Sequence, residues 1–145
     1  MPAIFKRPGV SFLYPENWTV DVEYTSTDHQ AVTVYSPSGG FWSVALHNLS
    51  VEPLKLAVSA LEAMRDEYQG LEVEDVTASI ADYDLIGFDM HFFHMDLTNT
   101  AQIRSFKSNE STYTVFCQAE DSEFEENHRV FDAITLSLIN GLKPS

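Results

Sequence analysis

The stretch GVSFLYPENW, residues 9–18, decides the fold that we expect for this chain. It combines a short apolar segment, a turn anchored at Pro15, and a tryptophan, Trp18, that opens the next segment. Beyond it, Val20 and Val22 alternate with polar residues, and a period of two is typical of a strand with one buried face. The sequence therefore predicts strands on both sides of the Pro15 turn.

Periodicity and turn signals divide the rest of the chain into strands and two helices. The first helix has Pro53 in its first turn and ends at Gly70, whereas the second begins with a capping box of Ser122 and Glu125 and ends at Gly141. The predicted elements are a hairpin over 31–49, a helix over 54–70, strands over 71–78, 85–97, 101–107 and 112–119, and a helix from 122 onward. The last three strands are expected to form an antiparallel meander.

Length and composition predict one domain over residues 1–145. The 145 residues are 44% hydrophobic and 12% aromatic, which is enough to bury one sizeable core. No apolar run approaches the roughly 18 residues that a membrane span needs, and the first residues lack the apolar segment of a signal peptide. Because Cys117 is the only cysteine, no disulfide framework exists, and we expect a cytoplasmic protein.

The charge of the chain restricts its partners. The formal net charge is −14, and the 8 Lys and Arg residues are scattered, so no basic stripe exists that could neutralise the phosphates of a nucleic acid. The acidity has two interpretations, a solvated surface or electrostatic steering toward a basic partner. We favour the solvated surface, because the acidic residues are spread along the chain.

The order of elements, the residues Phe12–Trp18 and the segment Phe131–Ile134 resemble the PsbP-like and Mog-type superfamily, together with small α+β domains of the DcrB type. The resemblance implies an α+β sandwich in which a mostly antiparallel sheet of about seven strands is flanked by two main helices. It also implies a role in binding. The photosystem branch of this superfamily works as an extrinsic protein subunit, the Mog branch binds the small GTPase Ran, and the DcrB type includes chaperones for secreted effectors.

The densest cluster of ligand-type residues is DMHFFHMD, residues 89–96. In a strand, successive side chains point to opposite faces, so His91 and His94 are expected on different faces and cannot share a metal ion. Each histidine has an aspartate two residues away on its own face, which could orient a general base. A small hydrolase or metal-dependent enzyme built on His91, His94 and Asp96 is therefore the alternative to a binding protein.

Other chemical motifs give no support to catalysis. Glu125 and His128 have the spacing of a di-iron ligand pair, but such a site needs a second pair on a facing helix, and the capping box already accounts for Glu125. Cys117 alternates with apolar residues and is expected to be a buried filler. We therefore predict no catalytic residues, no metal site and no cofactor.

The remaining functional signal is a surplus of aromatic residues on strands 41–49 and 85–97, which carry large side chains on both faces. Two apolar faces need two coverings, so we expect helices on both sides of the sheet; an exposed aromatic patch for a partner is the alternative. The hypothesis from sequence is a non-catalytic protein-binding or accessory module. Its predicted binding residues are Trp42, His47, His91 and Phe93, and its partner is a protein or peptide, with a basic one matching the acidic charge.

Overall fold

The computed structural model describes residues 2–24 and 30–142 and shows an α+β fold, as predicted. A seven-stranded antiparallel sheet has the strand order β3-β4-β5-β9-β8-β7-β6. Its strands are β3 (Thr19–Tyr24), β4 (Gln30–Tyr35), β5 (Phe41–His47), β6 (Glu72–Ile80), β7 (Tyr83–His94), β8 (Leu97–Lys107) and β9 (Thr112–Glu120). A separate hairpin consists of β1 (Pro2–Arg7) and β2 (Val10–Pro15), and the helices are α1 (Pro53–Glu67) and α2 (Asp121–Asn140).

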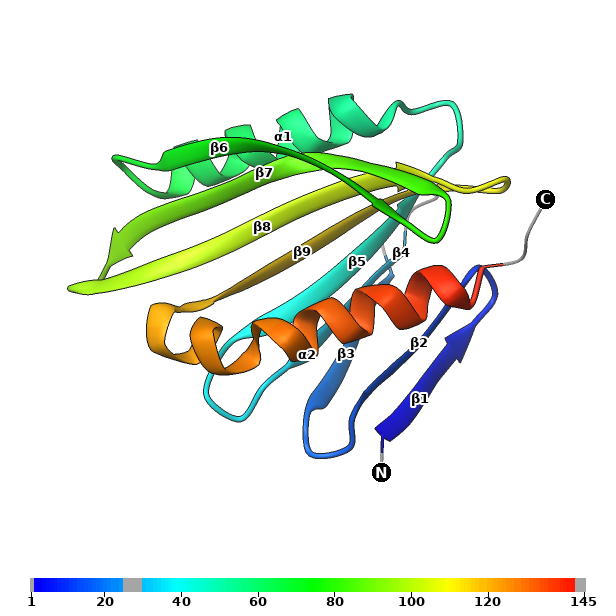
Figure 1. Ribbon diagram of the computed structural model, residues 1–145, viewed down its shortest axis with the longest axis horizontal. Coiled ribbons are helices and arrows are strands. Elements are labelled where there is room, and N and C mark those ends of the chain that lie inside the picture. The colour runs from blue at the N-terminus through cyan, green and yellow to red at the C-terminus, as the bar shows by residue number, and fades with distance from the viewer. Residues whose placement is uncertain (1, 25–29, 143–145) are drawn as a thin grey trace.

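The two helices lie on opposite faces of the sheet (Figure 1). On β9 the side chain of Phe116 packs into the cluster beneath α1, whereas Val115 and Cys117 belong to the cluster beneath α2. Helix α1 packs on β7, β8 and β9, while α2 packs on β8, β9 and strand β2 of the hairpin. Both faces of the sheet are therefore covered by a helix in part, as the aromatic surplus predicted.

The N-terminal stretch forms the centre of the core beneath α2. Trp18 is 8% exposed and meets the ring of Phe131 on α2 edge-on, with 5.7 Å between the ring centroids. Phe12 packs between Phe5 at 5.2 Å and Trp42 at 4.8 Å. The apolar strand and the Pro15 turn are confirmed, but β2 pairs with β1 rather than with β3. The sequence analysis did not predict β1, because its six residues PAIFKR show no clean alternation of apolar and polar positions.

Helix α2 begins differently from the prediction. Its N-cap is Glu120, and Ser122 lies inside the first turn, where its hydroxyl donates to the Glu120 carboxylate rather than forming a capping box. Glu123 is buried and accepts hydrogen bonds from the Gly40 N–H at 3.0 Å and from the Ser36 hydroxyl. The residues of the first turn thus tie α2 to the β4–β5 turn, which is a tertiary contact that local spacing does not reveal.

The boundary between β7 and β8 also differs from the prediction. Sequence placed one strand over 85–97, whereas the structure makes a two-residue turn at Met95 and Asp96, with φ of 52° and 63°. Two-residue hairpin turns favour Gly or Asn, because both central residues adopt positive φ. A methionine in this position is uncommon, so the turn carried no recognisable signal.

Replacement of Trp18 by alanine should destabilise the fold by about 3 to 5 kcal/mol, as truncations of large buried aromatic side chains do. The expected result is a lower free energy of unfolding in urea, with circular dichroism confirming that the variant folds. A loss below about 1 kcal/mol would contradict the packing of Trp18 against Phe131 described above.

Candidate functional site

The candidate site is the part of the sheet that lies beside α2 and is only partly covered by it, and we call it the open face. It is the α2 side of β6, β7 and β8, where one cross-strand row continues from Cys117 through Gln102 and Asp89 to Glu74. Cys117 lies in the core under α2, while Glu74 at the other end of the row is exposed. The residues of the open face are Glu72, Glu74, Val76, Asp89, His91, Phe93, Thr98, Thr100, Gln102 and Arg104.

An ion pair lies at the centre of the open face. The Arg104 guanidinium donates to Asp89 Oδ1 at 2.7 Å and to the backbone oxygen of Ile103 at 2.9 Å. Both side chains of the pair are largely covered, at 17% and 25% exposure. Glu74 stands directly across from Asp89 on the neighbouring strand, and like charges in that position repel. Arg104 is the one cation among the ten residues of the open face, so it offsets only part of the negative charge.

A short hydrogen-bonded chain connects the open face to the start of α2. His91 Nδ1 lies 3.1 Å from the Thr100 hydroxyl, which donates to Asp121 Oδ1 at 2.7 Å. His91 itself is exposed, whereas Thr100 is 8% exposed. These hydrogen bonds orient the His91 imidazole. The Thr100 hydroxyl donates its proton to a carboxylate rather than to a general base, so it is not an activated nucleophile.

Where α2 meets the open face, a hollow of about 470 Å³ lies between the helix and the strands. Its apolar lining includes Ile80, Leu85 and Phe131, and its polar lining includes Arg104 and Asp132. Asp132 is on α2, and burial raises the pKa of its carboxyl even though the neighbouring His128 and Arg104 lower it. The hollow therefore has an apolar floor with a carboxylate at its helical edge.

Cys117 also lines this hollow, and its environment makes the thiol unreactive. Burial raises the pKa of Cys117 to about 12, and the thiol points to the side-chain oxygen of Gln102 at 3.7 Å. Since the thiolate is the nucleophilic form, the residue cannot serve as a catalytic cysteine near neutral pH. This agrees with its predicted role as a buried filler.

The four predicted binding residues do not form one surface. Trp42 is on the same side of the sheet as the open face, but it is fully buried between Phe12 of the hairpin and α2, and its indole N–H donates to the Thr135 hydroxyl at 2.9 Å. The prediction that Trp42 contacts a partner is therefore wrong for this fold. His47 lies on the other face of the sheet, in alternation with Trp42 on β5. Only His91 and Phe93 are neighbours, on the open face, and Phe93 is 72% exposed.

The alternative enzyme site is not assembled either. His91 and His94 point to opposite faces of β7, as strand geometry predicted, and the His94 ring meets Tyr68 near α1 edge-on at 5.3 Å. Asp96 lies in the β7–β8 turn. Within residues 2–24 and 30–142, no three His, Cys, Asp or Glu side chains gather where they could hold a metal ion.

The structure extends the predicted residue Phe93 into a larger exposed apolar group. Met95 is 81% exposed and Leu97 is 52% exposed, so with Phe93 they place three large apolar side chains at the end of the β7–β8 hairpin. The signal was present in the sequence as the run FFHMDL, residues 92–97, but we assigned that run to a single strand. This apolar tip adjoins the open face at Phe93.

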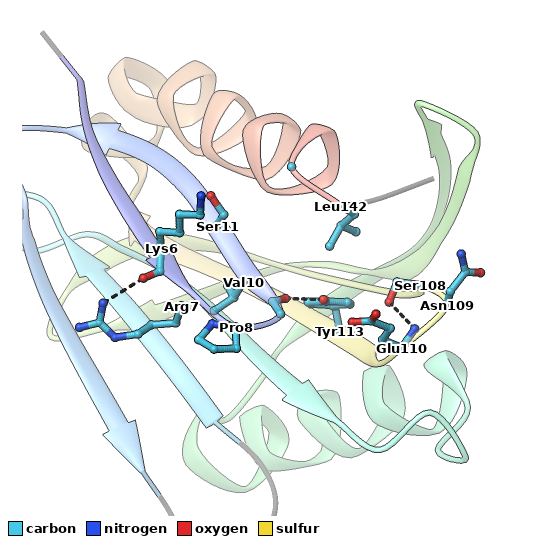
Figure 2. A pocket seen from close by; sticks show the side chains of 12 residues that line it. Lys6, Arg7, Pro8, Val10, Ser11, Ser108, Asn109, Glu110, Tyr113 and Leu142 are labelled. Carbon is cyan, nitrogen blue, oxygen red and sulfur yellow. Dashed lines mark hydrogen bonds between the residues drawn. The ribbon is translucent and has the colours of Figure 1, made fainter. Parts of the chain in front are cut away.

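A second hollow, of about 670 Å³, lies at the opposite end of the hairpin β1–β2 from its N-terminus (Figure 2). The Tyr113 hydroxyl donates to the Gly9 backbone oxygen at 2.5 Å there, and burial raises the pKa of this phenol. Arg7 donates to the backbone oxygen of Lys6 and covers the ring of Phe5, so its guanidinium is turned away from the hollow (Figure 2). The lining side chains make local turn contacts and do not converge on a reacting position.

Comparison with known proteins shows the fold. No family model and no curated protein matches the chain. Among solved structures, cyanobacterial PsbP (CyanoP) from Synechocystis is similar over 94% of this chain and 89% of its own, with a TM-score of 0.61 and 14% identity. PA94 of Pseudomonas aeruginosa, a protein of unknown function, is similar over 99% of both chains, with a TM-score of 0.56 and 8% identity.

LpqN of Mycobacterium tuberculosis, which is involved in cell envelope biogenesis, is similar over 92% of this chain and 86% of its own, with a TM-score of 0.53 and 12% identity. The chain therefore has the PsbP-like fold that its sequence resembles. In the part of the chain that the structure describes, neither helix is long and apolar enough to cross a membrane.

The reactivity of the Cys117 thiol tests whether this side chain is buried beneath α2. With a pKa of about 12, Cys117 is about one ten-thousandth thiolate at pH 8. The native protein should therefore not react with Ellman's reagent over an hour at that pH, and the thiol should react fully in guanidinium chloride. Rapid reaction of the native protein would contradict the burial of Cys117.

The raised pKa of Asp132 predicts a pH-dependent stability change. A carboxyl whose pKa is raised by folding destabilises the folded state once it ionises. The free energy of unfolding therefore falls as the pH rises from the ordinary aspartate range through the raised pKa. Asp132→Asn should therefore increase the free energy of unfolding at pH 7 and lose that advantage near pH 3.5. Asp66→Asn, at an exposed position on α1, is the matched control. An equal effect of Asp132→Asn at both pH values would refute the proposed cause.

Proposed function

We propose that this protein is a non-catalytic protein-binding module that contacts a basic protein or peptide through its open face. The observation that carries the proposal is the exposure of Phe93 and His91 on a strip of sheet that neither helix covers. Exposed aromatic side chains on a rigid strand offer a large contact area at a low cost in conformational entropy. Exposed apolar patches rimmed by polar residues mark interaction sites, and Phe93 forms such a patch with Met95 and Leu97.

The charge around these two residues supports a basic partner. Glu72 faces His91 directly, Glu74 faces Asp89, and Asp132 lines the edge of the hollow on α2. Arg104 is already engaged by Asp89, so the other carboxylates on the open face have no cation among its residues. A surface that carries lysine or arginine would complement the negative charge of the open face, and the net charge of −14 would steer that surface toward the protein.

The hollow beside α2 supports the same proposal. Among the described residues that line it, the hollow has an apolar floor and one carboxylate, Asp132, while its one cation, Arg104, is paired with Asp89. This lining suits a partner side chain that has an apolar stem and a cationic end, as lysine and arginine do. The stem would lie against Ile80 and Leu85, and the cationic end would reach Asp132. We place the protein in the cytoplasm as part of this proposal, because its one cysteine is free and buried.

The test uses a partner captured from the native lysate and measures its affinity for variants. Phe93→Ala should weaken binding about tenfold or more, because it removes the largest exposed side chain of the open face. Glu62→Gln, at an exposed position on α1 on the other side of the sheet, should leave affinity unchanged. Equal affinity for the wild type and both variants would overturn the proposal.

Salt provides an independent measurement on the same complex. Because the acidic surface acts mainly by steering, raising the salt concentration from about 0.05 to 0.5 M should slow association and leave dissociation nearly unchanged. Stopped-flow or surface plasmon resonance measurements separate the two rates. An association rate that does not respond to salt would show that charge does not steer the partner.

A further inference from the structure

Strand β6 is a long strand at the edge of the main sheet. It has nine residues, Glu72–Ile80, and pairs on one side with β7. On its other side no strand of the described parts of the chain pairs with it, and the helices pack on β7, β8 and β9 instead. Figure 1 shows β6 at the margin of the sheet. Its outward N–H and C=O groups are a ready template for an added strand.

The side chains of β6 decide which strand could be added. Glu72, Glu74 and Asp75 are exposed, and β6 has no lysine or arginine. The opposite edge strand, β3, is also acidic, with Asp21 and Glu23. Each copy of the chain carries a formal net charge of −14, so two copies repel one another as their edges approach. The edges therefore disfavour a second copy of this chain and complement a basic strand.

We propose that β6 accepts an extended basic segment of a partner protein as an eighth strand of the main sheet. This inference rests on the proposed function and specifies the form of its partner. Every pairing in the sheet is antiparallel, so the added strand is antiparallel to β6. Lysine or arginine side chains of the segment lie across from Glu72, Glu74 and Asp75. Main-chain hydrogen bonds supply affinity and the charges supply selectivity.

The register of the sheet shows what the added strand would meet. The cross-strand row that ends at Glu74 runs through Asp89, and the next row runs from Glu72 through His91. A basic side chain across from Glu74 therefore extends a row that already contains two carboxylates. On the α1 side, the partly buried Val73 lies between these positions and favours an apolar residue across from it.

The probe is a synthetic nine-residue peptide of lysine, valine and threonine, with lysines across from Glu72, Glu74 and Asp75. Two isomers carry backbone N-methyl groups on alternate residues, one on the residues whose N–H faces β6 and the other on those whose N–H faces away. Strand addition requires that the first isomer bind at least tenfold more weakly than the second. Equal affinity of the isomers, or no binding of the unmethylated peptide, would overturn strand addition.

Charge variants and hydrogen exchange test the location. Glu74→Lys should lower the affinity for the peptide at least tenfold, and Glu74→Gln should lower it less. Glu62→Lys on α1 should leave the affinity unchanged. Amide hydrogen exchange should slow at the outward N–H groups of β6 when the peptide is added, and not at β3. Slowing at β3 instead would refute the assignment to β6. If the isomers bind equally while Phe93→Ala still weakens the captured partner, strand addition fails and the proposed function stands.

Discussion

The position of α2 over the sheet determines which surface of this protein remains available. The contacts that hold the helix there include two hydrogen bonds: the Trp42 indole donates to Thr135, and the Glu123 carboxylate accepts from the Gly40 N–H. Both tie α2 to β5 and the β4–β5 turn, and the helix packs on β8, β9 and strand β2 of the hairpin. One helix and one hairpin do not span seven strands, so the α2 side of β6 and β7 is left uncovered. The open face is thus a consequence of the core rather than a separate feature.

The uncovered strip has an electrostatic imbalance that the fold does not correct. Arg104 is held by Asp89 and by backbone oxygens in a largely covered position, where loss of one partner would leave the other charge poorly solvated. The guanidinium therefore belongs to the structure of the sheet and is not free to neutralise Glu74 across the strand pair. Exposed carboxylates such as Glu74 contribute little to the stability of an isolated domain, but they bias which partners approach it.

The sequence predicted the parts of the structure that depend on local pattern. The Trp18 segment, the hairpin over 31–49 and the turn glycines specify their own geometry, and the overall resemblance placed two helices on the sheet. The errors arose where tertiary contacts decide. A period of two places Trp42 on one face of its strand, but it cannot say which part of that face a helix covers. The role of Glu123 was missed for the same reason, whereas the Met95–Asp96 turn was missed because its residues carry no recognisable turn signal.

The open face and the β6 edge are continuous, and this continuity explains how one segment could use both. A strand added along β6 would project alternate side chains onto the α2 side, next to Glu72 and Glu74 and one strand away from His91. Backbone pairing would fix the register, so the basic side chains of the segment would meet fixed carboxylates rather than a diffuse field. An antiparallel segment would end beside Glu72, at the start of β6, which lies next to the end of β7. The partner's residues that follow the segment could then reach Phe93 and the apolar tip. An extended basic segment with a large apolar residue beyond it is therefore the partner chemistry that this surface fits.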